Sequence, residues 1–507
     1  MIKFFCIIFL LQLILFECNA QKEDYFWIFG YDNSPPVGNN ETYFFDFNVG
    51  SSPKGEAGLS PLWIRGNNAS ICDKEGNLLF YTNGCHIADR INEIMPNGSG
   101  INAGNYLEEF RQDTCAHYPG TQDVLILPDP GNINGYYMLH KTVEYNGDFF
   151  MDNIKYTYVD ISLNGGTGDV TEKNVDIFSE DKLILQNYFT AIRHLNGSDW
   201  WIIQPDEEGN FITIILDESG FNVEAIQPSG IQFHPNASAA GTAKFSPDGT
   251  KYVYFNTDDN VLLYDYDRSN GLLSNMRTID IRPGGSLAVF TAIEFSPNSR
   301  FVYFSAVDEL YQLDTWEQEL EDGLILIDTW NGVQDPFNTI FYLMALAPDC
   351  KIYMCSGSGT FSYHVINKPN EKGPACDFVQ QGIRLPFVSA SATMPNFPRF
   401  RVDEDDKCDP TITSIFGDHV YYRRDMTVYP NPVRDVLTVE IPEGKEGKIV
   451  VFDIQGQLVW SDSDYDSYKD KVQINLSGLA VGSYSIEFLP EGNMKRLVYT
   501  SQVVRVE

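Results

Sequence analysis

One stretch decides the fold: residues 243–255, AKFSPDGTKYVYF, predict a strand, a tight turn and a second strand. Pro247 presets φ and Gly249 tolerates positive φ, which is the chemistry of a tight turn. Residues 252–255 are β-branched or aromatic and suit a buried, pleated sheet. Two further copies carry their turns at Pro297 and Pro348, each about 50 residues further along. A repeat of that length is typical of propellers and other repeat architectures.

Three more strand–turn–strand units precede these copies, with turns near Gly76, Asn134 and Asn196. Each unit leaves room for two outer strands, and four antiparallel strands per repeat make a propeller blade. A seventh blade is expected to form from both ends of this region. The strand Thr393–Arg399 would pair with N-terminal strands within Tyr25–Phe47, because such closure hides the sheet edges. We therefore predict an all-β propeller of about seven four-stranded blades over residues 21–400, with six or eight blades as alternatives.

The composition limits the classes of partner. The chain has 507 residues, 35 Lys and Arg against 70 Asp and Glu, and a formal net charge of −35. So acidic a chain repels nucleic acid and anionic membrane surfaces, because basic side chains are needed to neutralise phosphates. We predict no nucleic-acid partner. The aromatic content of 14% suits an all-β chain with large buried faces.

The first 20 residues have the pattern of a secretory signal peptide. Lys3 supplies the positive start, Phe4–Phe16 is an apolar run, and Cys18-Asn19-Ala20 places cleavage after Ala20. The apolar run is too short to span a bilayer, and no other stretch is long and apolar enough, so we predict no membrane span. A lipoprotein at Cys18 is the alternative, which Glu17 disfavours.

Nine cysteines leave seven in the mature chain: Cys72, Cys85, Cys115, Cys350, Cys355, Cys376 and Cys408. Export makes disulfides possible, and the odd count leaves at least one thiol unpaired. The preferred pairs are Cys85 with Cys115 and Cys350 with Cys376, although the sequence alone does not fix them. No spacing fits a zinc site, and we predict no metal and no cofactor.

The propeller pattern ends at about residue 400. Residues 401–426 contain the charge run Asp403–Lys407 and are predicted to be a linker. Residues 427–507 hold seven short candidate strands separated by turns, which favours a small immunoglobulin-like β-sandwich.

This last domain resembles the type A C-terminal sorting domain of the type IX secretion system, found in one group of double-membraned bacteria. The residues that carry the resemblance are Tyr429, Pro430, Asn431, Pro432, Asp453, Gly456, Gly482 and Tyr484. The resemblance implies export through the periplasm and the outer membrane, with the type IX machinery as partner. Members usually lose this domain and are secreted or attached to the outer cell surface. The final residues, Val503–Glu507, are less basic than in many members.

The first part resembles the WD40-like propellers that often precede such sorting domains. The carrying stretches include Gly76–Gly84, Phe245–Gly249 and Pro348–Tyr353. The Trp-Asp and Gly-His pairs of true WD40 blades are absent. The resemblance implies a scaffold and no particular chemistry.

No catalytic motif stands out. There is no HExxH, no GxSxG at a strand-to-helix turn, and the seven histidines stand singly. The acidic clusters Asp258-Asp259-Asn260 and Asp403–Asp406 are predicted to be a solvated turn and part of the linker. Trp200, Trp201 and Trp316 could stack on carbohydrate, but packing between blades is the favoured interpretation. We predict no catalytic residue.

Two functions remain open. The favoured one is an exported, non-enzymatic module that binds an unknown protein or glycan ligand at or outside the cell surface. The alternative is a secreted propeller hydrolase or lyase acting on an extracellular polymer. Both would use the central channel, where loops from all blades meet. Two carboxylates, or a carboxylate and a histidine, converging there with raised pKa values would favour the enzyme.

Overall fold

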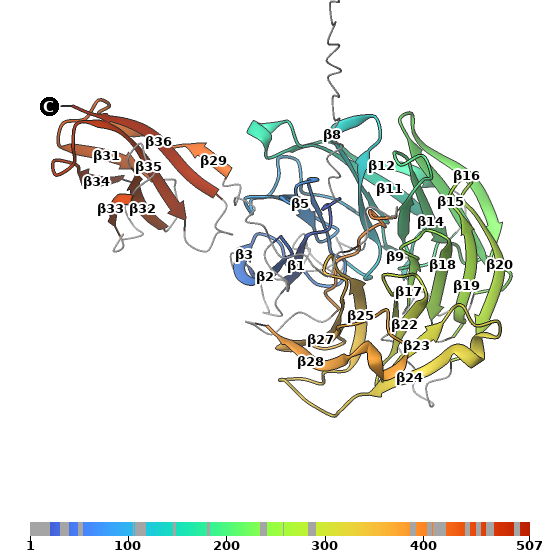
Figure 1. The fold of residues 1–507 in the computed structure, drawn as a ribbon. Coiled ribbons are helices and arrows are strands. Elements are labelled where there is room, and N and C mark those ends of the chain that lie inside the picture. Colours follow the sequence, from blue (N-terminus) through green and yellow to red (C-terminus); the bar gives the residue numbers. More distant parts are fainter. Residues whose placement is uncertain are drawn as a thin grey trace, which may run out of the picture.

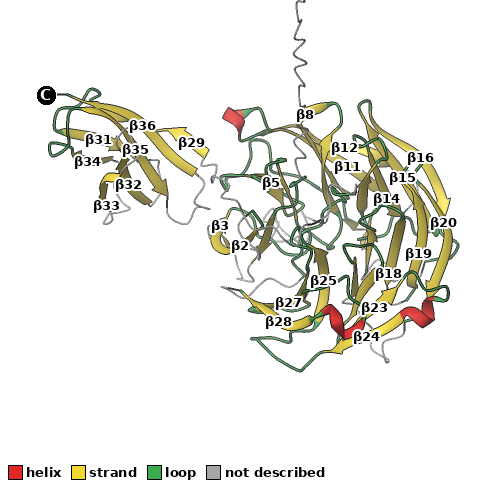
Figure 2. Cartoon of the chain, viewed as in Figure 1, coloured by secondary structure: helices red, strands yellow, loops and turns green. Residues whose placement is uncertain are grey.

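The computed structural model describes residues 21–30, 40–48, 54–104, 106, 118–145, 149–179, 183–233, 241–256, 258–281, 291–385, 392–402, 408, 422–441, 447–452, 458–462, 471–490 and 497–506. These residues are built almost wholly of strands joined by turns (Figure 2). None of the helices found there is both long and apolar enough to cross a bilayer. The predicted signal peptide, including Ala20, lies outside the described residues.

Seven sheets in the described part of the chain follow one another around a ring (Figure 1). Blade 1 is β1 (Phe26–Gly30), β2 (Asn40–Asp46) and β3 (Lys54–Ser60), and blade 2 is β4 (Ala69–Cys72), β5 (Leu78–Thr82) and β6 (Ile87–Asp89). Blade 3 is β7 (Val124–Asp129), β8 (Asn132–His140), β11 (Asn153–Asp160) and β12 (Asp169–Ser179). The short hairpin β9 (Glu144–Tyr145) and β10 (Phe149–Phe150) lies between β8 and β11 in the sequence.

The next four blades are regular four-stranded meanders. Blade 4 is β13 (Thr190–Arg193), β14 (Trp200–Pro205), β15 (Asn210–Asp217) and β16 (Gly220–Pro228), and blade 5 is β17 (Thr242–Phe245), β18 (Lys251–Asn256), β19 (Asn260–Asp267) and β20 (Leu272–Ile279). Blade 6 is β21 (Thr291–Phe295), β22 (Phe301–Ala306), β23 (Glu309–Asp314) and β24 (Leu324–Thr329), and blade 7 is β25 (Phe341–Leu346), β26 (Ile352–Ser356), β27 (Ser362–Ile366) and β28 (Phe378–Arg384). The predicted propeller is confirmed, but blades 1 and 2 have three described strands each rather than four.

The repeated turn has the geometry that its sequence predicts. In blade 5 the amide of Gly249 donates to the carbonyl of Ser246 at 2.9 Å, and the hydroxyl of Ser246 donates to Asp248 at 2.6 Å. Gly249 has a φ of +67°, and the matching positions of blades 6 and 7, Ser299 and Cys350, have φ values of +61° and +64°. The left-handed turn is therefore kept in all three copies, although only one of them uses glycine.

Aromatic side chains fill the spaces between blades. Between blades 4 and 5, Phe211, Tyr252, Tyr254 and Tyr264 lie in one buried cluster. Trp200 and Trp201 are buried, which confirms the predicted packing role for both. Trp316 is 65% exposed, so the same prediction is wrong for that residue.

The strand predicted at Thr393–Arg399, which was expected to pair with the N-terminal strands of the seventh blade, is not found. Residues 392–402 form no strand. They meet the start of blade 1 through side chains instead: the Gly30 amide donates to the Thr393 hydroxyl, the rings of Trp27 and Phe397 are in contact, and Arg401 pairs with Asp24. Pro395 and Pro398 explain the difference, because proline has no N–H to give to a strand ladder.

The C-terminal residues form a β-sandwich, as predicted. One sheet holds β29 (Tyr422–Asp425), β36 (Leu497–Arg505), β35 (Gly482–Pro490), β32 (Gly447–Phe452) and β33 (Leu458–Asp462), and the other holds β30 (Val428–Tyr429), β31 (Val436–Glu440) and β34 (Lys471–Asn475). Leu437 and Ile474 of the small sheet share one buried cluster with Ile449, Ile486 and Val503 of the large sheet.

Substitution of Trp27 tests whether blade 1 is packed as the structure shows. Trp27 is fully buried and its ring centroid lies 5.0 Å from Phe47 and 6.0 Å from both Tyr353 of blade 7 and Phe397. We expect Trp27→Ala to lower the free energy of unfolding by about 3–5 kcal/mol, because it leaves a large cavity. Ile133→Ala, at a side chain 86% exposed, is the control and should change it by less than about 0.5 kcal/mol. Equal urea midpoints for the two variants would contradict this packing.

Candidate functional site

The centre of the ring is occupied by the chain itself. Residues 392–402, which we call the central segment, run across the middle of the blades (Figure 1). The amide of Asn396 donates to the carbonyl of Asn68, just before blade 2, and the amide of Arg399 donates to the carbonyl of Ala191 in blade 4, both at 2.8 Å. The segment therefore donates backbone hydrogen bonds to the start of blade 2 and to the first strand of blade 4.

Asn396 joins three blades through its side chain. Its amide nitrogen donates to the carbonyls of Val124 in blade 3 and Phe189 beside blade 4, at 3.0 and 3.1 Å. Its oxygen accepts a bond of 3.3 Å from Gln122, whose side chain also pairs with both backbone groups of Ala243 in blade 5. Since Asn396 is almost fully buried, these bonds replace water and fix the segment in place.

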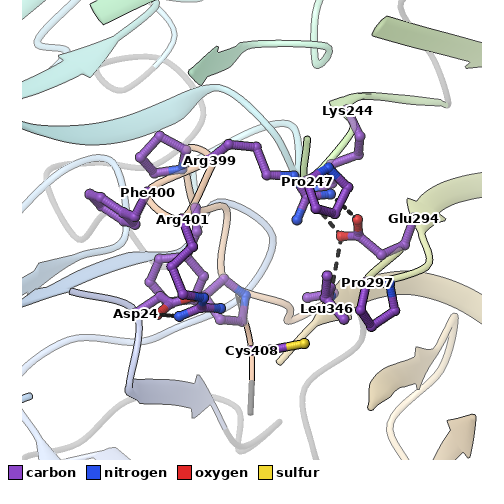
Figure 3. Close-up of a pocket in the computed structure, with 14 residues that line it drawn as sticks. Asp24, Lys244, Pro247, Glu294, Pro297, Leu346, Arg399, Phe400, Arg401 and Cys408 are labelled. Carbon is purple, nitrogen blue, oxygen red and sulfur yellow. Dashed lines mark hydrogen bonds and ion pairs between the residues drawn. The ribbon is translucent and has the colours of Figure 1, made fainter. Parts of the chain in front are cut away.

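Arg399 makes the second set of contacts, with blades 5 and 6. Its Nε donates to the carbonyl of Phe245 at 2.8 Å, and its guanidinium forms an ion pair with Glu294 (Figure 3). Glu294 also accepts a bond of 3.2 Å from the amide of Leu346 in blade 7 and lies 3.9 Å from the ammonium of Lys244. Burial lowers the pKa of Lys244, and the Arg399 charge adds to this effect.

The end of the segment is attached to blades 1, 4 and 7. Arg401 forms an ion pair with Asp24, and the ring of Phe400 meets that of Trp200 edge-on at 5.6 Å. Cys408 is disulfide-bonded to Cys350, in the repeated turn of blade 7. With these bonds, residues 392–402 and Cys408 contact every one of the seven blades described above.

The disulfide corrects one predicted pair. Cys350 is bonded to Cys408 rather than to Cys376, which is a buried free thiol. The sequence places Cys376 close to Cys350, but Cys376 ends a short turn on the outer side of blade 7, whereas the central segment brings Cys408 to the inner turn. Cys85 is also disulfide-bonded, and its predicted partner, Cys115, lies outside the described residues.

Little space remains beside the central segment. The pocket between it and the turns of blades 5 and 6 has a volume of about 40 Å³. Small-molecule sites usually have roughly 300–1,000 Å³, so this pocket has room for a few water molecules but not for a sugar or a peptide. Its lining residues are Asp24, Lys244, Pro247, Glu294, Pro297, Ala345, Leu346, Pro395, Phe397, Pro398, Arg399, Phe400, Arg401 and Cys408.

The charges in this pocket are paired with one another. It has two carboxylates, those of Asp24 and Glu294, and each forms an ion pair with an arginine of the central segment. No histidine is among the residues that line it. The pocket therefore has neither the open space nor the free acid–base pair that a glycoside hydrolase or lyase site needs.

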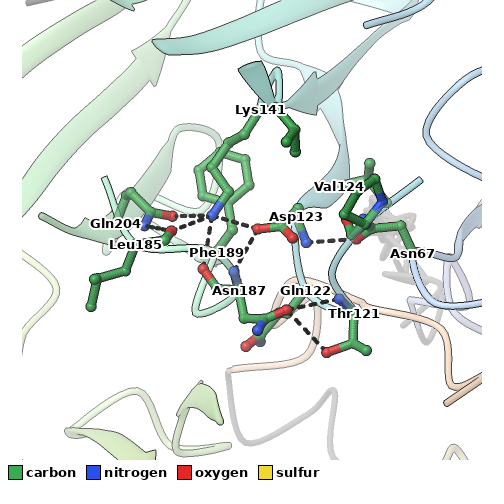
Figure 4. A network of polar contacts seen from close by, with 12 residues as sticks. Asn67, Thr121, Gln122, Asp123, Val124, Lys141, Leu185, Asn187, Phe189 and Gln204 are labelled. Carbon is green, nitrogen blue, oxygen red and sulfur yellow. Dashed lines mark hydrogen bonds and ion pairs between the residues drawn. The ribbon is translucent and has the colours of Figure 1, made fainter. Parts of the chain in front are cut away.

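A second charged network is sealed inside the protein between blades 3 and 4 (Figure 4). The ammonium of Lys141 lies 2.5 Å from a carboxylate oxygen of Asp123 and donates to the carbonyls of Leu185 and Asn187 and to the side chain of Gln204, at 2.8–2.9 Å. Burial raises the pKa of Asp123 and lowers that of Lys141. Because both side chains are fully buried, the network joins blades and cannot touch a substrate.

The other candidate groups are structural. In the part of the chain that the structure describes, no group of three or more His, Cys, Asp or Glu side chains could hold a metal ion. Asp259 accepts hydrogen bonds from Tyr254 and Asn256, both at 2.9 Å. The cluster Asp258-Asp259-Asn260 is at a turn, as predicted, but Asp259 is buried rather than solvated. The cluster Asp403–Asp406 lies outside the described residues.

Among the sorting-motif residues that the structure describes, Asn431, Gly482 and Tyr484 lie beside the end of β36. The peptide bonds before Pro430 and Pro432 are cis, and Asn431 between them accepts a bond of 3.0 Å from the amide of Val504. Tyr484 donates its hydroxyl to the carbonyl of Ala480 at 2.7 Å, while Tyr429 is exposed. Gly482 begins β35. Asp453 and Gly456 lie outside the described residues.

Sequence reasoning missed the residues that fill the channel: Glu294, Asn396, Arg399, Arg401 and Cys408. A signal was present, because the stretch MPNFPRFR (394–401) has two prolines that disfavour a strand and two arginines in an acidic chain. Their partners are far away in the sequence, up to 377 residues for Arg401 and Asp24, so the pairing could not be inferred.

Comparison with known proteins identifies the C-terminal domain. Residues 427–500 match the family model described as "Secretion system C-terminal sorting domain". No curated protein sequence matches the chain.

Similar solved structures include a periplasmic gluconolactonase from Pseudomonas aeruginosa, with 10% identity, a TM-score of 0.36, and coverage of 72% of this chain and 98% of that one. A putative 6-phosphogluconolactonase from Bacteroides uniformis has 13% identity and a TM-score of 0.35, with 90% and 98% covered. PorZ of Porphyromonas gingivalis, described as a surface component of the type IX secretion system, has 11% identity and a TM-score of 0.29, with 93% and 68% covered.

Substitution of Arg399 tests whether the contacts of the central segment stabilise the propeller. Arg399→Ala leaves Glu294 buried without its main partner, and we expect a loss of about 3–5 kcal/mol in the free energy of unfolding. Arg384→Ala is the matched control, because its ion pair with Asp335 is exposed and should contribute about 1 kcal/mol or less. Chemical denaturation of both variants measures the difference, and similar losses would contradict a buried, organising role for Arg399.

Two buried histidines predict a dependence of stability on pH. Burial lowers the pKa of His140 to about 3 and that of His364 to about 4, from 6.5. The unfolded chain then binds more protons below pH 6.5, so stability is complete above that pH and falls as the pH drops towards the folded-state values. By pH 5 we expect a loss of roughly 2 kcal/mol for each histidine. Between pH 7 and 5, the free energy of unfolding of His140→Gln should fall less steeply than that of the wild type. An unchanged slope would show that His140 does not contribute to the loss of stability at low pH.

Proposed function

We propose that this chain, whose C-terminal type IX sorting domain exports it to the outer surface or the medium, works there as a non-enzymatic binding or interaction module. The observation that carries the proposal is the filled centre of the propeller. The central segment contacts every blade and leaves a pocket of about 40 Å³. A binding role through the outer surface of the blades is compatible with such a closed ring.

The charge arrangement supports this role over catalysis. An active site needs an acid or base that reaches the substrate, with a pKa suited to proton transfer. The two carboxylates at the pocket, Asp24 and Glu294, are ion-paired with arginines, and the buried pair Asp123 and Lys141 has no access to solvent. The chain therefore offers a rigid, acidic scaffold whose loops and outer strands are free to bind.

The sorting domain defines the remaining partner. It implies interaction with the type IX secretion machinery, and we propose that the propeller crosses the outer membrane already folded. The contacts of the central segment suit that requirement, because a ring closed by buried hydrogen bonds, ion pairs and a disulfide resists opening during transport.

Turnover assays on the purified full chain test the proposal against the hydrolase or lyase alternative. The protein is incubated with neutral and acidic extracellular polysaccharides, and released reducing ends and unsaturated uronates are measured. We expect no product above the buffer blank, and the same result for Glu294→Gln. Product that accumulates with the wild type and disappears with Glu294→Gln would overturn the proposal and place an active site at the channel.

A further inference from the structure

Trp316 is the exception among the tryptophans singled out in the sequence. It lies in the loop between β23 and β24 of blade 6 and is 65% exposed. One face of its ring is covered by the guanidinium of Arg300, 4.7 Å from the ring centroid. Arg300 is itself held by two bonds to Asp314, at 3.0 and 2.7 Å, and Asp314 is buried. The indole is thus supported from one side.

The loop that carries Trp316 is fixed by further bonds. The amide and the hydroxyl of Thr315 both donate to the carbonyl of Arg300, at 3.0 and 2.8 Å. The ammonium of Lys372, from blade 7, bridges Asp314 at 3.1 Å and Glu317 at 3.0 Å. The result is a preorganised aromatic ring with an exposed ammonium and an exposed carboxylate next to it in the fold.

We propose that Trp316 is the stacking platform of a carbohydrate site that takes a neutral pyranose ring of an extracellular glycan. The proposal rests on the proposed binding function and names its ligand class. A pyranose has an apolar face of C–H bonds, which packs on an aromatic ring, and hydroxyls at its edge, which bond to charged side chains. Glu317 and Lys372 supply an acceptor and a donor for these hydroxyls. Because the indole is already held, little conformational entropy is lost on binding.

The surroundings favour a sugar over a protein partner. Protein hot spots place an aromatic anchor within a ring of contacts that excludes water. Trp316 is followed instead by Glu317, Gln318 and Glu319, which are half-buried or exposed polar residues. The charges that hold the ring are paired, Arg300 and Lys372 with Asp314 and Glu317. The other charged residues of the loop, Glu319, Glu321 and Asp322, are all acidic and disfavour an anionic ligand. Such a setting suits an uncharged, hydroxyl-rich ligand.

Affinity electrophoresis of the full chain tests the site with four neutral polysaccharides as probes: a glucan, a mannan, a xylan and a galactan. We expect at least one to retard the wild type, and Trp316→Ala to weaken that binding by about tenfold or more. Trp316→Phe, which keeps a flat ring, should bind with intermediate affinity. The control is Phe337→Ala, an aromatic side chain 59% exposed in the loop between β24 and β25, which should bind like the wild type.

The outcomes separate this inference from the proposed function. Binding that survives in Trp316→Ala overturns the platform while the binding function stands. No retardation of the wild type by any of the four probes overturns the neutral glycan as the ligand. Release of reducing ends from a retained probe contradicts the non-enzymatic function itself. Thermal midpoints of all variants, measured in the same buffer, show that Trp316→Ala is folded.

Discussion

A ring of blades is stable only if its first and last members are joined. Here blades 1 and 7 pack directly, with Trp27 against Tyr353 and Phe29 against Tyr363, and the central segment adds contacts with every blade. Asn396 holds blades 2, 3 and 4 together, Arg399 holds blades 4, 5 and 6, and Arg401 with Cys408 adds blades 1 and 7. A single buried hydrogen bond contributes about 1 kcal/mol, and buried ion pairs add little net stability, but losing one partner is costly. The contacts therefore favour one closed arrangement.

The same closure limits what the propeller can do. In the part of the chain that the structure describes, the central segment lies across the middle of the ring, and the carboxylates of Asp24 and Glu294 beside it are paired with arginines. We therefore propose that binding uses the outside of the ring. Trp316 combines exposure with a supported ring there, since the guanidinium of Arg300 covers one face of the indole and Thr315 is bonded to the carbonyl of Arg300. Export by the sorting domain places this surface outside the cell, where the proposed glycan ligand would be found.

Features that depend on residues a few positions apart could be predicted from the sequence, whereas contacts between residues far apart in the sequence could not. The turn at Pro247, its two copies and the sorting motif at Tyr429–Pro432 each depend on residues a few positions apart, so the propeller and the sandwich could be predicted. The strand predicted at Thr393–Arg399 is absent because Pro395 and Pro398 have no N–H to donate to a strand ladder. The partner of Cys350 and the Arg399–Glu294 pair depend on the closed ring, in which residues 58 and 105 positions apart meet. The exposure of Trp316 likewise follows from the loop it occupies, since the regular strands bury their tryptophans.

Hydrogen exchange of the central segment, measured by mass spectrometry on the full chain, tests the account most directly. The amides of Asn396 and Arg399 donate to the carbonyls of Asn68 and Ala191 in the closed ring. Peptides covering residues 392–402 should therefore exchange as slowly as those from the buried strand β17. Complete exchange of these peptides within seconds, while β17 stays protected, would show that the segment does not fill the channel and would return the centre of the propeller to the search for a ligand site.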